Sequence, residues 1–63
     1  MDGSMAELSS VTSVLEELTK RVTSLADQEA SATHDEIAHE LYAVERVLAG
    51  AQRRLVRLVD AHR

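Results

Sequence analysis

Large apolar residues recur along this chain at alternating spacings of three and four, which is the repeat of an amphipathic α-helix. The pattern is present in both halves of the sequence, and no stretch alternates apolar and polar residues as a β-strand does. The repeating residues are Leu8, Val11, Leu15, Leu18, Val22 and Leu25 in the first half, and Ile37, Leu41, Val44, Leu48, Ala51, Leu55 and Leu58 in the second. The sequence therefore predicts an all-α fold.

The two repeats do not join into one long helix, because counting in sevens from Leu25 reaches Ala32 and misses the second repeat. The segment between them contains no large apolar residue. Thr33 and Glu36 also have the T-x-x-E spacing of a capping box, in which the threonine hydroxyl accepts from an amide of the first helical turn. We therefore expect a turn near residue 33.

The expected organisation is one helical-hairpin domain over residues 5–63. Its helices are predicted at about 5–30 and 34–62, with a turn at about 31–33, to within roughly two to four residues. Residues 1–4 are interpreted as a disordered natural start or as a remnant of cloning.

The charged residues fall into blocks that favour antiparallel helices. Residues 1–17 carry only acidic charges, residues 27–45 carry six acidic and no basic residues, and residues 46–63 carry five arginines against Asp60 alone. An antiparallel hairpin brings the acidic start beside the basic end, although each exposed pair contributes only about 0–1 kcal/mol. A single continuous helix paired antiparallel with a second copy would satisfy the charges equally well, but the phase break and the cap favour the hairpin.

A two-helix hairpin uses one apolar stripe per helix, and the sequence contains more apolar residues than that. The predicted hairpin core is Leu8, Val11, Leu15, Leu18, Val22, Leu25, Leu41, Val44, Leu48, Leu55 and Leu58. A second stripe consists of Ala38, Tyr42, Ala49, Val56 and Val59, while Val14 and Val47 lie on the opposite flank. We predict that this second stripe packs in a symmetric dimer, giving a four-helix bundle. The alternative is a groove for the helix of a partner protein.

The small size of the chain also favours self-association. With 63 residues, a single core rarely supplies more than about 3–5 kcal/mol, and the absence of cysteine excludes disulfides. No apolar run approaches the roughly 18 residues of a membrane span, and no charged-then-apolar leader opens the chain. We therefore expect a cytoplasmic homodimer that has no membrane partner.

Catalytic machinery is not evident in the sequence. The chain has no cysteine nucleophile and no glycine-rich loop, and its serines cluster in the first predicted helix and the turn, where no histidine is placed to activate them. Glu36 and His39 have the E-x-x-H spacing of di-iron bundles, but with Ile37 and Leu41 in the core they point toward water. We therefore predict neither enzymatic activity nor a cofactor, and metal binding through Glu36 and His39 is the weakest of the functional hypotheses.

Nucleic-acid binding is a stronger rival, because the end of the chain contains a basic strip. The strip consists of Arg46, Arg53, Arg54, Arg57 and Arg63. A net charge of −4 opposes phosphate binding. In length and two-helix pattern the chain is similar to the ROP family of plasmid RNA-binding regulators, whose hairpins dimerise into a four-helix bundle. The likeness is one of architecture, and no motif carries over residue by residue.

The favoured hypothesis is a small non-catalytic protein–protein interaction or regulatory module that acts as a homodimer. Its partners are a second copy and another protein, contacted by the acidic turn end at residues 27–45 and by what stays exposed of the second stripe. A ROP-like RNA- or DNA-binding dimer is the alternative.

Overall fold

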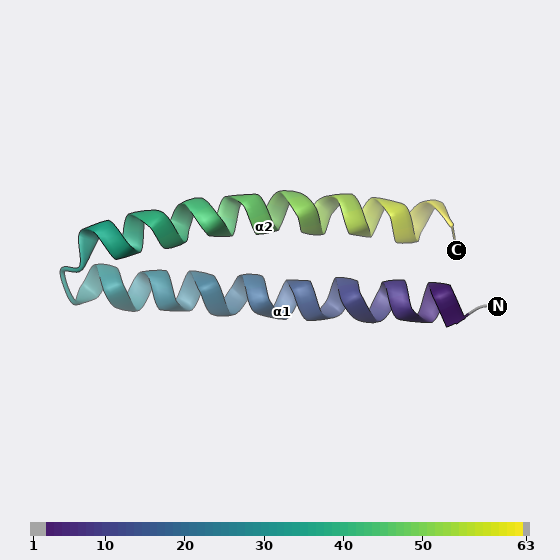
Figure 1. The fold of residues 1–63 in the computed structure, drawn as a ribbon, viewed down its shortest axis with the longest axis horizontal. Coiled ribbons are helices and arrows are strands. Elements are labelled where there is room, and N and C mark those ends of the chain that lie inside the picture. Colours follow the sequence, from purple (N-terminus) through teal and green to yellow (C-terminus); the bar gives the residue numbers. More distant parts are fainter. Residues whose placement is uncertain (1–2, 63) are drawn as a thin grey trace.

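The computed structural model describes residues 3–62 and shows two antiparallel helices joined by a tight turn (Figure 1). Helix α1 comprises Gly3–Ser31 and helix α2 comprises Asp35–Ala61. The predicted all-α helical hairpin is confirmed, with helix bounds within two residues of those expected. Gly3 and Ser4 belong to α1, whereas Met1 and Asp2, the rest of the segment interpreted as disordered or a remnant, lie outside the described residues, as does Arg63.

The two helices form a single layer, and they do not enclose a hydrophobic core. Its Cα atoms extend 49 × 14 × 11 Å, and the radius of gyration is 14.5 Å, whereas a compact domain of this length has about 11 Å. Each helix is therefore covered by protein on one side only. Within residues 3–62, no large side chain is fully buried, and the buried residues are Thr19, Ala26 and Ala38.

The contact between the helices is formed by residues at heptad spacing, most of them small or polar. This seam consists of Met5, Thr12, Thr19 and Ala26 on α1 and Ala38, Glu45, Gln52 and Val59 on α2, all buried or half-buried. The hydroxyls of Thr12 and Thr19 each donate to the carbonyl four residues earlier, Leu8 O and Leu15 O, at 2.7 Å. Their hydrogen bonds are thus satisfied within α1, and threonine can occupy the seam without an unpaired polar atom.

The observed seam differs from the predicted hairpin core. Six of the predicted core residues flank the seam and are half-buried: Leu8, Leu15, Val22, Leu41, Leu48 and Leu55. The other five are exposed by 39–47%: Val11, Leu18, Leu25, Val44 and Leu58. Two helices cannot enclose a stripe of large side chains, but they approach closely over small ones. Each helix is therefore rotated so that mostly small or polar residues, and not its exposed large apolar ones, face the other helix.

The second stripe, predicted as a dimer or partner interface, lies mostly against α1. Ala38 is only 4% exposed, and Tyr42, Ala49 and Val59 are half-buried. Val56 is 40% exposed. Apart from Tyr42, this stripe consists of alanine and valine, which are on average smaller than the mostly leucine side chains of the predicted core, and small side chains fit in the space between the helices.

The end of α1 has the hydrogen bonds of a Schellman motif. The His34 amide donates to Glu29 O at 2.8 Å, and the Thr33 amide donates to Ala30 O at 3.1 Å. Thr33 occupies the position between them with φ 63°, in the left-handed region where glycine is usual. The chain therefore reverses through a β-branched residue held in an unfavourable conformation.

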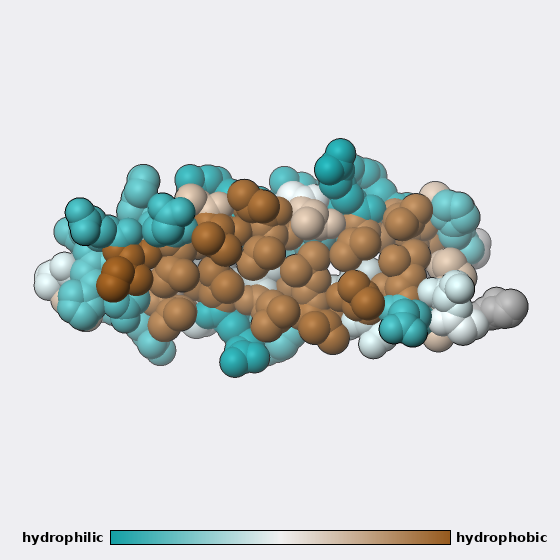
Figure 2. All heavy atoms as spheres, viewed as in Figure 1, coloured by the Kyte–Doolittle hydropathy of each residue, from teal (hydrophilic) through white to brown (hydrophobic). Residues whose placement is uncertain are grey.

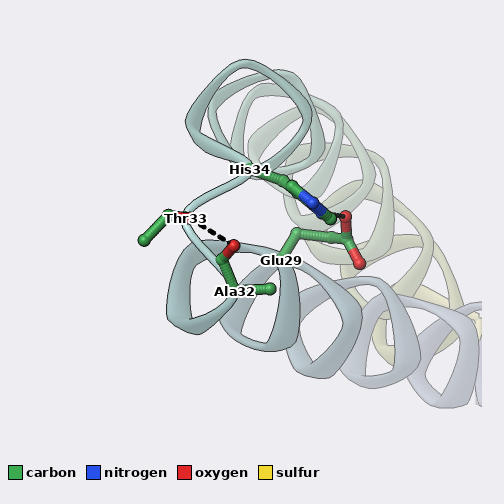
Figure 3. A network of polar contacts seen from close by, with 4 residues as sticks. All are labelled: Glu29, Ala32, Thr33 and His34. Carbon is green, nitrogen blue, oxygen red and sulfur yellow. Dashed lines mark hydrogen bonds and ion pairs between the residues drawn. The ribbon is translucent and has the colours of Figure 1, made fainter.

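The predicted capping box at Thr33 and Glu36 is wrong. The residue before α2 is His34, and no side chain caps the helix there. The Thr33 hydroxyl instead donates to Ala32 O, while His34 Nδ1 lies 2.8 Å from Glu29 Oε1 (Figure 3). The left-handed backbone of Thr33 is incompatible with the extended conformation that a capping residue adopts.

Gly50 lies within α2 and carries the usual penalty of glycine in a helix. A Cβ atom at this position would meet only the Arg53 side chain, at 3.9 Å. Gly50→Ala is therefore expected to stabilise the protein by about 1 kcal/mol per chain, measured by urea unfolding. Ala43 lies two turns earlier on the same side of α2, so Ala43→Gly is the matched control and should cost a similar amount. A destabilised Gly50→Ala variant would show that another molecule approaches the backbone there.

Candidate interaction face

Large apolar side chains gather on one face of the hairpin, along most of its length and across both helices (Figure 2). Exposed residues of this kind are Val11, Val14, Leu18 and Leu25 on α1 and Ile37, Val44, Val47 and Leu58 on α2. We call these eight residues the apolar face. Val47 is the most exposed of them, at 72%.

The two helices contribute to the same face because of their antiparallel directions. On α1, Leu18 and Leu25 immediately precede the seam residues Thr19 and Ala26, and on α2 Val44 precedes Glu45 in the same way. One step back along a helix turns a side chain by about 100°. Since the helices run in opposite directions and face each other, the residue before a seam residue points to the same side of the hairpin in both helices.

The hairpin has a larger accessible surface than a compact protein of the same mass. The chain exposes 4646 Å², whereas a compact monomer of 6.9 kDa exposes about 4,000 Å². The excess of about 600 Å² approaches the roughly 800 Å² that each partner contributes to a standard interface. Large contiguous apolar patches on small proteins are typical of sites of association.

The other side of the seam is polar. There Val56 lines a shallow groove with Val59 and with four polar residues, Ser9, Thr12, Ser13 and Asp60. A second groove on the hairpin is lined by Glu16, Thr19, Lys20, Thr23, Ser24, Glu45 and Gln52. Val56 thus has polar neighbours, and the predicted second stripe does not extend into a second apolar face.

Tyr42 joins the two helices near the turn. Its hydroxyl donates to the Asp27 carboxylate on α1. This hydrogen bond raises the pKa of Tyr42 above its ordinary value of 10.0, with smaller contributions from burial and from the negative charge of Asp27. The sequence predicted Tyr42 at an interface between copies. In the structure its hydroxyl forms a hydrogen bond between the two helices of one hairpin.

The raised pKa gives a direct test of this contact, because Tyr42 is the only tyrosine and there is no tryptophan. Tyrosinate absorbance should titrate above pH 10.0, and Asp27→Asn should lower the midpoint toward that value. The stabilisation is present below the ordinary pKa and is lost as the pH rises through the raised one. Asp35→Asn, which changes another acid of the turn end, should leave the midpoint unchanged. An unchanged midpoint in Asp27→Asn would contradict the contact.

Charge pairing within the hairpin is sparse. Between residues 3 and 62, the ion pairs are Lys20 with Glu16 at 4.0 Å and, when His34 is protonated, His34 with Glu29 at 2.8 Å. In that part of the chain no acid of α1 forms an ion pair with an arginine of α2, although the charge blocks predicted such pairs. The four arginines of α2 are exposed instead: Arg46, Arg53, Arg54 and Arg57.

Glu36 and His39, the candidate metal ligands, are both exposed near the start of α2. Across residues 3–62, no three side chains of the metal-binding types come together. Neither α1 nor α2 has a segment long and apolar enough to cross a bilayer.

Comparisons with known proteins found no significant match to this chain. No protein-family model matches it, and neither a curated protein nor a solved structure matches it significantly. The candidate site therefore stands on its own geometry, in which the apolar face is the dominant feature.

Sequence patterns alone placed Val14 and Val47 on a flank and gave them no role. The signal that identifies the apolar face is the row of small residues one step after the large ones, such as Thr19 after Leu18 and Ala38 after Ile37. In such a sequence the stripe of small residues indicates the side of the helix that packs closely against the other helix. The neighbouring stripe of large residues indicates the apolar face.

Proposed function

We propose that this protein is a non-catalytic protein–protein interaction or regulatory module that acts as a homodimer, in which two hairpins pack by their apolar faces into a four-helix bundle. The exposed apolar face across both helices is the observation that supports the proposal. Packing two such layers gives each large side chain neighbours on a second side, as in four-helix bundles. A face that meets its own copy about a two-fold axis needs no other partner to be covered.

Sedimentation equilibrium over a range of concentrations tests the dimer. We expect twice the mass of the chain, with helix content that falls on dilution because folding and association are coupled in so small a core. A monomer that keeps its full helix content on dilution would contradict the proposal.

In such a dimer the tip of the acidic turn end, at the start of α2, stays accessible to a further protein. Its acidic residues are Asp27, Glu29, Asp35, Glu36, Glu40 and Glu45. Asp35 and Glu36 lie in the first turn of α2 and are exposed. We expect the partner to present basic residues to them, since charge complementarity speeds association and selects partners.

Capture from lysate with two baits tests this contact. Wild-type protein should retain the partner, while Asp35→Lys combined with Glu36→Lys should lose it at equal dimer content. Both residues lie outside the apolar face, and comparing the two baits at equal dimer content separates binding of the partner from any change in dimerisation. Equal capture by both baits would assign the partner to another surface.

Nucleic acid is the second candidate ligand, favoured by the exposed arginines of α2, which have no ion-pair partner on α1 within residues 3–62. Phosphate contacts make affinity fall steeply with salt. We expect no binding of duplex RNA or DNA at low salt, because the net charge is −4. Binding at low salt that weakens steeply on salt addition would favour the ROP-like alternative.

A further inference from the structure

Helix α2 has a charge distribution that complements itself when reversed. Residues 35–45 carry four acidic residues and no basic one, whereas residues 46–62 carry four arginines against Asp60. Two copies of α2 packed antiparallel would set each acidic half beside a basic half. Packed with their turns at the same end, two hairpins would bring both acidic turn ends together, which is unfavourable.

One row of residues on α2, along the outer edge of the apolar face, has an acidic residue at one end and a basic residue at the other. Glu40, Val47 and Arg54 are spaced by seven, so they lie on the same side of α2 at intervals of two turns, about 10 Å. All three are exposed. Within residues 3–62, neither Glu40 nor Arg54 has an ion-pair partner in its own hairpin. The row therefore has an acid and a base at equal distances from a central valine, and both charges are available.

Along the length of the hairpin, Val47 also lies near the middle of the apolar face. On α2 the face runs from Ile37 to Leu58, and on α1 it runs from Val11 to Leu25, with Leu18 at its middle. Thr19, next to Leu18, lines one groove with Glu45 and Gln52 of α2, on either side of Val47. Both stripes are thus centred at the same level of the hairpin. A two-fold axis at this level lets each copy cover the whole face of the other.

We propose that the second copy packs on the apolar face about a two-fold axis that crosses the hairpin near Val47, at right angles to the helices. This inference rests on the proposed homodimer. Each α2 lies antiparallel to α2 of the other copy, and the two turns lie at opposite ends of the bundle. Val47 meets the partner's Val47, and Glu40 lies beside the partner's Arg54 at two symmetric positions.

Exchanging the two charges tests the orientation. Glu40→Arg and Arg54→Glu each place like charges together twice in a homodimer, so each should raise the dissociation constant by roughly tenfold. Mixing the two variants restores both pairs, and we expect the heterodimer to form in preference to either homodimer. The double variant, Glu40→Arg with Arg54→Glu, should regain wild-type affinity. A purely statistical mixture with unchanged affinities would overturn the orientation.

A single introduced cysteine gives an independent test, because the chain has none of its own. Val47→Cys should form a disulfide between copies on mild oxidation, since a residue at the two-fold axis meets itself within bonding range. Ala61→Cys, two turns beyond Arg54 on the same side of α2, is the matched control and should not cross-link.

The outcomes separate the two proposals. A dimer by sedimentation that shows neither the Val47→Cys cross-link nor heterodimer preference would overturn the orientation and leave the homodimer standing. Monomers in every experiment would overturn both.

Discussion

Val44→Glu is expected to dissociate the dimer, whereas Val56→Glu is expected to leave it intact. Both valines are in α2 and are almost equally exposed, at 39% and 40%. Val44 belongs to the apolar face, and its replacement by glutamate removes apolar burial and sets a charge in the interface. We estimate a loss of roughly 2 kcal/mol per copy, so the two copies together raise the dissociation constant by about 1,000-fold.

Val56 is the matched control because it lies on the opposite side of the seam, in an open groove whose lining is polar apart from Val56 itself and Val59. A carboxylate there remains hydrated, so the change in dissociation constant should stay within about twofold. Sedimentation equilibrium of both variants at the same concentrations measures the difference. Equal dissociation of the two variants would mean that the dimer does not use the apolar face, and dissociation of Val56→Glu alone would return the interface to the stripe predicted from the sequence.

Thr33→Gly is expected to stabilise the protein by about 1 kcal/mol per chain, or about twice that for the dimer. Thr33 has φ 63° at the end of α1, where glycine adopts the left-handed conformation without steric cost. The gain is limited because glycine also increases the entropy of the unfolded chain. Thr33→Asn should give a smaller gain, since asparagine tolerates this conformation better than threonine does.

The sign of the effect distinguishes two accounts of the turn. If Thr33 capped α2 through its hydroxyl, both Thr33→Gly and Thr33→Ala would destabilise the protein. In the structure the hydroxyl bonds only its neighbour, Ala32 O, so Thr33→Ala should be close to neutral and Thr33→Gly should be stabilising. Thermal unfolding of the series Thr, Ala, Asn and Gly at one protein concentration provides the ranking. A ranking with threonine the most stable would contradict the structure.

Much of the fold follows from local patterns in the chain. The three-and-four spacing of residues such as Leu15 and Leu48 depends only on helix geometry, and the phase break after Leu25 depends only on counting. Both helices and the antiparallel hairpin could therefore be predicted from the sequence. The turn was located correctly, but its chemistry was not, because the backbone conformation of Thr33 is not visible in residue types.

The rotation of each helix about its axis could not be predicted in the same way. Apolar periodicity shows that a helix has an apolar side, and Leu18 and Val44 lie on it, but it does not show which neighbour that side meets. We assigned the largest residues to the contact between α1 and α2, as if the hairpin had to bury them by itself.

By itself, then, the sequence determined the number of helices, their lengths, their antiparallel pairing and the surplus of apolar residues. Only the tertiary structure decided which stripe faces which neighbour: Thr19, Ala26 and Ala38 pack between the helices, while Leu18, Val44 and Val47 remain on the open face. The physical reason is that two helices in one layer approach closely only over small side chains. Large apolar side chains are buried only when a second layer of helices packs on them. The apolar periodicity of a single chain does not show where such a layer would lie.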